Sequence, residues 1–319
     1  MAVGPGGSAL VLVDDTVVPL DPHGKPGPPL ELGAGLRPTT LGSDGSGNLY
    51  VAGVRDVDLQ GDVDAFIRRY VGDQLALHVD VDLASGANEV PVRISAALGH
   101  VSLATRVQFD PLGRDAEDFV RVDRMSASLE LIDSAPLGSV HAIDDQGTVY
   151  YFDSPGTLTA LALDGSTTWT GETGLTGGVD ISVGPDEVWV ASRAEVTERH
   201  LGGVRSFGRA DGAAGVSLDF QLETSAQGEF REASVAIAAH PCGGASLLTA
   251  TRACDRARSC EATMTALSRI ESDGTRSVVA MDLPYQQSIF GWFSGASTAA
   301  DGASVALFHS AGGHQPVGY

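Results

Sequence analysis

The chain contains a single lysine, Lys25, and only two asparagines among its 319 residues. Basic side chains are scarce: 20 lysines and arginines stand against 41 aspartates and glutamates, which gives a formal net charge of -21. Phosphate backbones and anionic membrane surfaces repel such a chain, so we expect no nucleic-acid partner. The excess charge favours solubility and remains compatible with cations or with neutral ligands such as glycans.

Long apolar runs are also missing. No run approaches the roughly 20 residues that cross a bilayer as a helix, so we predict no membrane insertion. The first residues, MAVGPGGSALVLVDD, lack the basic start and long apolar stretch of a signal peptide. We nevertheless expect an extracytoplasmic protein (secreted, periplasmic or at the cell surface) whose signal peptide is absent from this sequence.

Cysteine is rare, with Cys242, Cys254 and Cys260 as the whole set. The last two flank DRARS between two strand-like segments, so a disulfide between Cys254 and Cys260 is predicted if those segments pair. Two alternatives stay open: Cys242 pairs with either of them, or all three are free thiols. Neither a Cys-x-x-Cys motif nor a Cys/His zinc spacing occurs, which argues against a zinc site.

Helical periodicity is nearly absent, and only residues 64–70 can be read as either helix or strand. What recurs is a module of strand, Gly/Asp turn, strand, variable loop and hairpin, about 40–58 residues long. The turns are typical of tight hairpins, in which glycine takes a positive φ without steric cost; they include Asp44-Gly45, Asp164-Gly165, Asp211-Gly212 and Asp273-Gly274. The clearest copies of the module span residues 42–81, 139–172 and 179–223, and fainter ones span 90–132, 233–283 and 289–310.

Two stretches resemble known repeats. The string DGSGNLYVAG at 44–53, followed by GDVDAF at 61–66, resembles the bacterial seven-bladed β-propeller repeat. The string GTVYYFDSPGTLTALALDGSTTW at 147–169 is similar to the pyrroloquinoline-quinone-like propeller repeat. Both resemblances imply an all-β fold, a β-propeller of four-stranded antiparallel blades. The quinone cofactor itself is not expected, because Trp189 and Trp292 do not take the module position that Trp169 takes.

The number of blades follows from the modules. Five complete modules lie between about residues 36 and 283, and the C-terminal pair at 290–310 joined to the N-terminal hairpin at 16–32 makes a sixth blade. We therefore predict six blades in a single domain, residues 1–319, with the ring closed by both termini. Seven blades is the alternative, because residues 8–13 form a further strand that the six-blade scheme does not use. The domain is expected to be a monomer or part of a longer chain.

The loops between the second and third strands of the modules are the candidate binding face. They lie at 55–65, 110–118, 153–157, 193–203, 253–262 and 310–316. In the first, Asp56, Asp58, Gln60 and Asp64 fall at positions 1, 3, 5 and 9 of a calcium loop of the EF-hand type, with Gly61 at the turn. These four residues are the candidate calcium ligands. The match fails at position 12, which is Ile67, so the alternative is a solvated hairpin loop and no cofactor.

No catalytic motif is present, and no catalytic residue is assigned. The sequence favours a non-catalytic binding or scaffold propeller of a secreted or cell-surface bacterial protein, with a protein or glycan ligand on the long-loop face. The alternative is a six-bladed propeller hydrolase, lactonase or lyase with a divalent metal at the channel mouth. Such enzymes assemble their sites from single residues on different blades, which leaves no local motif.

Overall fold

A computed structural model of the whole chain gives the fold, and the described residues lie in strands and in the turns between them. Within this part of the chain no residue is helical, and no helix is long and apolar enough to cross a membrane. The described residues are 2–3, 9–13, 16–21, 25–33, 35–44, 46–56, 63–81, 87–108, 119–137, 140–154, 156–175, 179–196, 199–221, 229–254, 260–281, 291–298, 304–310 and 316–318.

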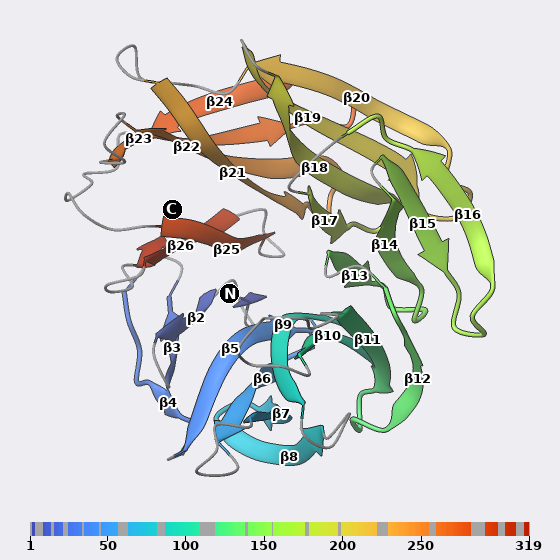
Figure 1. The fold of residues 1–319 in the computed structure, drawn as a ribbon, viewed down its shortest axis with the longest axis vertical. Coiled ribbons are helices and arrows are strands. Elements are labelled where there is room, and N and C mark those ends of the chain that lie inside the picture. Colours follow the sequence, from blue (N-terminus) through green and yellow to red (C-terminus); the bar gives the residue numbers. More distant parts are fainter. Residues whose placement is uncertain are drawn as a thin grey trace. The chain divides into compact units, whose positions relative to one another are not determined.

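The strands of the described residues form seven sheets, in each of which consecutive strands lie side by side (Figure 1). The first three sheets contain β1 (Ala2–Val3), β2 (Ala9–Val13), β3 (Thr16–Leu20) and β4 (Leu30–Glu31); β5 (Leu36–Ser43), β6 (Asn48–Asp56), β7 (Val63–Val71) and β8 (Gln74–Val81); and β9 (Asn88–Ala97), β10 (His100–Gln108), β11 (Phe119–Ser126) and β12 (Leu131–Ala135).

The next three sheets are also four-stranded, and the seventh has three strands. They contain β13 (His141–Ile143), β14 (Val149–Ser154), β15 (Thr157–Leu161) and β16 (Thr167–Glu172); β17 (Val179–Val183), β18 (Glu187–Val196), β19 (Arg199–Gly208) and β20 (Ala214–Gln221); β21 (Glu229–Ala239), β22 (Ala245–Cys254), β23 (Cys260–Ile270) and β24 (Arg276–Met281); and β25 (Gly291–Thr298), β26 (Ser304–Ser310) and β27 (Pro316–Gly318).

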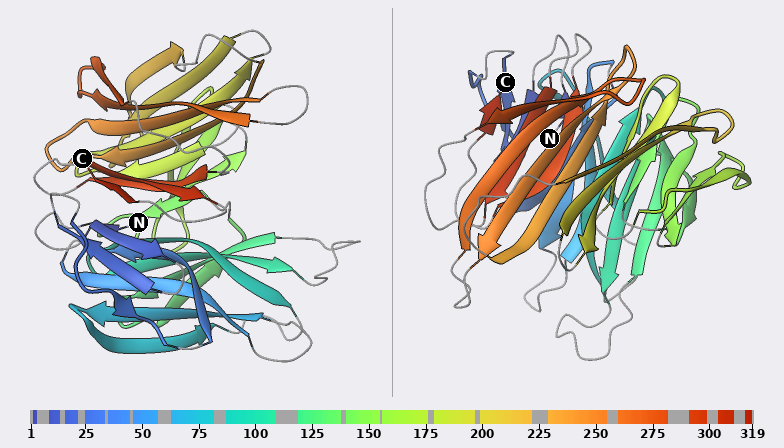
Figure 2. Two further views of the ribbon diagram at one scale, coloured as in Figure 1. Left: turned by 90° about the vertical axis from the view of Figure 1, so that its left-hand side faces the viewer. Right: turned by 90° about the horizontal axis from the view of Figure 1, so that it is seen from above.

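The chain divides into two compact units, one of residues 1–153 with 159–168 and one of residues 154–158 with 169–319. Within the first unit β5 packs against β9, and β9 against β13; within the second, β17 packs against β21 and β21 against β25. The first strand of each of these sheets thus contacts the first strand of the next, which is how propeller blades pack. The predicted all-β propeller with six four-stranded blades is confirmed by the six four-stranded sheets, and Figure 2 shows the twist of their strands.

The terminal segments differ from the predicted arrangement. We expected the N-terminal hairpin and the C-terminal pair to share one sheet, but β1–β4 and β25–β27 form separate sheets. Residues 9–13, which the six-blade scheme left unused, are β2, and they pair with β3 from Ala9↔Leu20 to Val13↔Thr16. Pairing across so short a connection costs less loop-closure entropy than pairing with the distant end of the chain.

The ambiguous segment 64–70 lies in β7, because its side chains alternate between two apolar faces. Ala65 and Ile67 join Tyr50 and Ala52 in a buried cluster with Leu103 and other residues of the third sheet. A helix would place these side chains on different faces, whereas a strand with period two aligns them. The core of the first unit is therefore built between neighbouring sheets rather than inside one.

Hydrogen bonds also link the first strands of successive sheets. In the first unit Ile94 N donates to Thr40 Oγ1 at 3.3 Å, and Ile143 N donates to Ser95 Oγ at 3.1 Å. In the second unit Ile237 N donates to Asp180 Oδ2 at 2.8 Å. These side-chain acceptors satisfy backbone N–H groups on the buried first strand, which is otherwise an open edge of its sheet.

Candidate functional site

Each four-stranded meander has two unlike ends. The connections between strands one and two, and between strands three and four, lie at one end, which we call the turn end. The connection between strands two and three lies at the other, which we call the loop end. All the predicted binding loops within the four-stranded sheets connect strands two and three, so they belong to the loop ends.

The turn ends are closed by aspartates that bind their own turns. Asp144 Oδ1 accepts the backbone N–H groups of Gln146 and Thr148, each at 2.9 Å, and its Oδ2 accepts the Tyr150 hydroxyl at 2.9 Å. This arrangement orders the turn before β14 and also satisfies a phenol that is 1% exposed.

The same spacing recurs in the second sheet. Asp44 accepts from Ser46 N at 2.9 Å, and its Oδ2 lies 3.5 Å from the Tyr50 hydroxyl. Burial, together with the charge of Asp44, raises the pKa of Tyr50 to about 12. The second and fourth sheets thus close the turn between their first two strands with the same aspartate–tyrosine contact.

The hairpin turns between strands three and four are closed in a similar way. The hydroxyl and then the backbone N–H of Ser166 lower the pKa of Asp164 by donating to its carboxylate. The backbone N–H of Thr275, and then its hydroxyl, lower the pKa of Asp273. The carboxylates at these turns therefore already accept hydrogen bonds from within their own turn.

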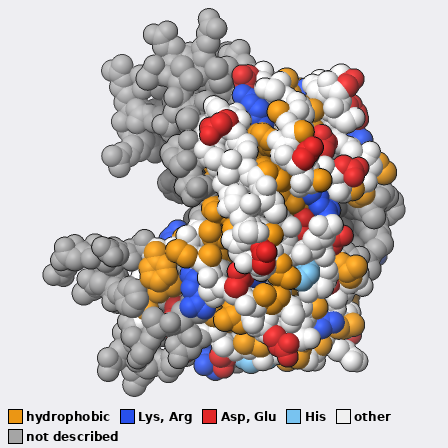
Figure 3. Space-filling model, turned by 90° about the vertical axis from the view of Figure 1, so that its right-hand side faces the viewer, with side chains coloured by type: hydrophobic (Ala, Val, Ile, Leu, Met, Phe, Trp, Pro, Cys, Tyr) orange, Lys and Arg blue, Asp and Glu red, His pale blue; other side chains and the backbone are white. Residues whose placement is uncertain are grey.

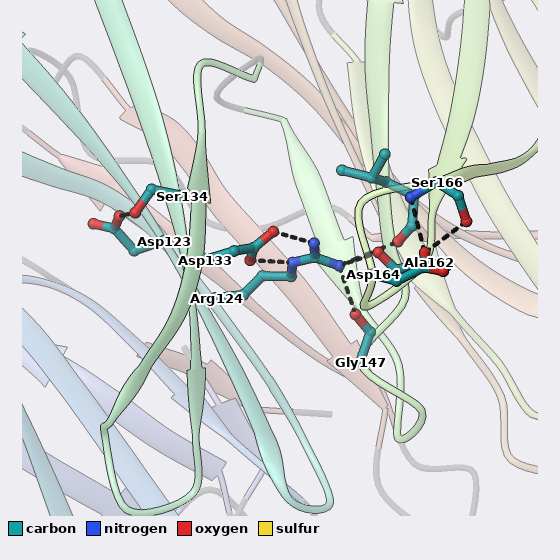
Figure 4. A network of polar contacts seen from close by, with 9 residues as sticks. Asp123, Arg124, Asp133, Ser134, Gly147, Ala162, Asp164 and Ser166 are labelled. Carbon is teal, nitrogen blue, oxygen red and sulfur yellow. Dashed lines mark hydrogen bonds and ion pairs between the residues drawn. The ribbon is translucent and has the colours of Figure 1, made fainter.

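Arg124 joins the turn end of the third sheet to that of the fourth (Figure 4). Its guanidinium pairs with Asp133 on β12, with Nε 2.5 Å from Oδ1, and its side chain is only 3% exposed. Nη1 donates to the carbonyl oxygens of Ala162, at 2.5 Å, and Gly147, at 3.3 Å. A buried cation is tolerable here because it has both a carboxylate and backbone acceptors.

Equivalent contacts cross two other joints between sheets. Arg69 on β7 donates to the carbonyl of Ala127, in the hairpin turn of the third sheet, at 3.0 Å. Trp169 on β16 donates from Nε1 to the carbonyl of Arg209, in the hairpin turn of the fifth sheet, at 3.1 Å. The turn ends are therefore engaged in holding sheets together, which leaves fewer polar groups for a ligand.

The loop ends differ from one another. Residues 57–62 and 109–118 make long connections in the second and third sheets, whereas 155–156 and 197–198 make short ones in the fourth and fifth. The predicted long loop at 193–203 is wrong, because most of it is strand. Glu195 pairs with His200 and Val196 with Arg199, since the strand pattern of β18 and β19 continues almost to the tip.

The candidate calcium residues lie at the loop end of the second sheet. Asp56 ends β6 opposite Val63, and Asp64 stands on β7 opposite Arg55; Asp58 and Gln60 lie outside the described residues. Arg55 lies between two carboxylates, with Nη1 3.2 Å from Asp80 Oδ2 and Nη2 3.8 Å from Asp64 Oδ2. In the described part of the chain no three His, Cys, Asp or Glu residues group closely enough to hold a metal ion. Calcium at this loop stays a prediction.

A set of buried polar residues below the loop of the third sheet was not predicted. Asp123 on β11 is 0% exposed, and its Oδ1 accepts from Arg121 Nε at 2.6 Å and from Ser134 Oγ at 2.5 Å. Asp123 Oδ2 and Thr105 Oγ1 are buried without a hydrogen-bond partner among the described residues. Asp123 stands opposite Leu103, so both lie on the face that packs against the second sheet.

A signal for this set exists in the sequence. In the strand FVRVDRMS, Arg121 and Asp123 alternate with valines and so share one face, while Arg124 falls on the other face. Charges therefore occur on both faces of a strand that must bury at least one. Buried charges need partners, and the alternation indicates that the two side chains pair on one face. Figure 3 shows acidic side chains scattered among apolar and basic ones on the face drawn.

The two predicted disulfide partners lie at the loop end of the sixth sheet. Cys254 ends β22 and Cys260 begins β23, and they are register partners. Cys242 lies in the turn before β22 and is an exposed free thiol. The alternative in which Cys242 pairs with one of the others is therefore wrong, because β22 runs from Ala245 to Cys254 and separates the two ends.

Comparison with known proteins adds similarity in fold at very low sequence identity. No protein-family model matches the chain, and no curated protein sequence matches it. Among solved structures, the chain is similar to a protein of unknown function from Bacteroides caccae, with 9% identity, a TM-score of 0.43, and coverage of 87% of this chain and 95% of that one. It is also similar to the sialidase of Trypanosoma rangeli in complex with sialic acid, with 9% identity, a TM-score of 0.47, and coverage of 98% of this chain and 58% of that one. The Dos1 propeller is similar too, with 9% identity, a TM-score of 0.47, and coverage of 86% of this chain and 66% of that one.

Proposed function

We propose that the chain is a non-catalytic binding propeller of a secreted or cell-surface protein, and that the loop ends of its sheets hold a protein or glycan ligand. The observation that carries this proposal is the contrast between the two ends of the sheets. At the turn ends Asp144, Arg124 and Trp169 are engaged in closing turns and joining sheets. The loop ends carry connections of unlike length on the same rigid strands.

Rigid strands with variable loops suit recognition. The contacts between first strands and the joints at the turn ends hold the bases of the loops in place, so less ordering entropy is lost when a ligand binds. Connections of unlike length offer a ligand more varied contacts than turns of equal length do. Binding residues occur preferentially on such loops because a scaffold fixes their positions.

The charge of the loops narrows the ligand class. The connection 57–62 contains Asp58 and Asp62, and the connection 109–118 contains four acidic residues against Arg114 alone. Acidic loops repel polyanions and accept hydrogen bonds from hydroxyl and amine groups. A neutral glycan, or a protein surface with basic residues, fits this chemistry.

The test compares loop-end with turn-end variants. Binding of the purified protein to an array of neutral glycans and to basic proteins would identify a ligand. Replacing residues 57–62 by Asn-Gly keeps the β6–β7 register, because Asp56 and Val63 are its last pair and a two-residue turn closes it. The matched control, Asp164→Ser, changes a turn end.

We expect the loop variant to weaken binding at least tenfold and the control to bind like the unchanged protein. Retained binding in the loop variant together with loss in the control would overturn the proposal. So would turnover of the bound compound, which would identify an enzyme instead of a binding module.

A further inference from the structure

The β22–β23 hairpin of the sixth sheet ends at its loop end in a pair of cysteines. The register runs without a break from Arg252↔Ala262 through Ala253↔Glu261 to Cys254↔Cys260, with residues 255–259 as the connection. Directly opposite residues of an antiparallel pair point to the same face of the sheet. The backbone thus brings these two residues together on one face.

The spacing of such a pair suits a disulfide. Opposite residues have Cα atoms about 5.5 Å apart in a hydrogen-bonded pair and about 4.5 Å apart in the other kind. Disulfides join residues whose Cα atoms lie about 4.4–6.8 Å apart. Either kind of pair therefore meets the Cα spacing of a disulfide.

The remaining cysteine does not compete within the chain. Cys242 lies at the turn end of the sixth sheet, and β22 (Ala245–Cys254) separates it from the pair. A strand of this length extends about 30 Å at about 3.3 Å per residue, far beyond the reach of a disulfide.

We propose that Cys254 and Cys260 form a cross-strand disulfide that closes the loop end of the sixth sheet. Two cysteine thiols form the S–S bond, and an oxidant of the disulfide class accepts their two electrons and two protons and leaves as two thiols. The bond fixes both ends of the connection 255–259, and reduction releases them. This proposal does not rest on the proposed binding function.

Peptide mapping tests the bond in the unaltered protein. The three cysteines fall on three different tryptic peptides, 232–252, 253–256 and 259–269. The folded protein is incubated with oxidised glutathione, free thiols are blocked with iodoacetamide, and the digest is analysed by mass spectrometry before and after reduction. We expect 253–256 and 259–269 to be linked, and 232–252 to carry the blocking group.

Blocking of both Cys254 and Cys260 before reduction would overturn the proposal, as would a link from either to peptide 232–252. A second measurement follows melting temperature with and without a phosphine reductant. We expect reduction to lower the melting temperature by several degrees in the unaltered protein and in Cys242→Ser. In the double variant Cys254→Ser, Cys260→Ser the reductant should leave the melting temperature unchanged. If the reductant lowered it as much in the double variant as in the unaltered protein, that result would also contradict the bond.

Discussion

His240 Nε2 lies 2.8 Å from Ser246 Oγ, six residues along the chain, at the turn of the sixth sheet that corresponds to the one closed by Asp144 and Tyr150 in the fourth sheet. The sixth sheet therefore uses a neutral imidazole and a hydroxyl in the place of a carboxylate and a phenol. His240 is 2% exposed, and its Nδ1 has no hydrogen-bond partner among the described residues. A turn closed through a buried imidazole responds to pH.

Stability should fall with acid through His240. Burial, and then the charge of Arg269, lower its pKa below the ordinary 6.5, while Glu271 acts in the opposite direction. The unfolded chain then takes up the proton at a higher pH than the folded chain, so this contribution is complete above 6.5 and is lost as the pH falls through the folded pKa. Each unit of lowering corresponds to about 1.4 kcal/mol.

Urea unfolding between pH 5 and 8 measures this effect. The variant His240→Gln should lose part of the decrease in stability toward pH 5 that the unaltered protein shows. The control is His78→Gln. His78 lies in the first unit, where its Nε2 is 3.0 Å from Asp80 Oδ1, whereas His240 lies in the second unit. Identical pH profiles for His240→Gln and the unaltered protein would contradict the assignment.

Removing the Arg124 guanidinium should destabilise the first unit strongly. The variant Arg124→Leu leaves Asp133 without its guanidinium partner and removes one of the donors to the carbonyl of Ala162, and breaking such a buried pair costs about 3–5 kcal/mol. The control is Arg269→Leu, which removes an exposed pair with Glu271 and should cost about 1 kcal/mol or less. Denaturant unfolding distinguishes the two, and equal losses would show that Arg124 does not join the sheets.

The two aspartate–tyrosine turns offer a matched comparison of hydrogen-bond strength. The Tyr150 hydroxyl lies 2.9 Å from Asp144 Oδ2, and the Tyr50 hydroxyl lies 3.5 Å from Asp44 Oδ2. A double-mutant cycle with Asp→Ala and Tyr→Phe should give a coupling energy of about 1.5 kcal/mol for the first pair and about 0.5 kcal/mol or less for the second. The reverse order would mean that distance does not govern this turn.

Calcium should raise the melting temperature if Asp56 and Asp58 bind it. A ligand that binds only the folded state adds about 2.7 kcal/mol at a hundredfold excess over its Kd. Millimolar calcium should therefore raise the melting temperature and a chelator should lower it, and Asp56→Asn with Asp58→Asn should remove the response. The control Asp73→Asn changes an exposed carboxylate at the turn end of the same sheet. An unchanged melting curve in calcium would show that the aspartates are solvated.

Local patterns in the sequence sufficed for the strands and for most of the turns. The recurring module predicted β6 and its neighbours, while residues 64–70 of β7 could be read as helix or strand. The Asp44-Gly45 and Asp164-Gly165 turns predicted hairpins, because such turns close through hydrogen bonds within a few residues. The order of strands in each sheet followed for the same reason, since each strand pairs with the next. The candidate binding loops were also placed between the correct strands, because loop position depends only on that order.

The tertiary structure alone decided which residues the joints bring together. Arg124 reaches Ala162, 38 residues away, and Asp180 accepts from Ile237, 57 residues away; no local pattern gives such partners. It likewise decided that Asp123 is buried and that β1–β4 and β25–β27 form separate sheets. Strands and turns are stabilised by neighbours in the chain, whereas burial and the contacts between sheets depend on packing among segments distant in sequence, which the pattern of any one segment does not specify.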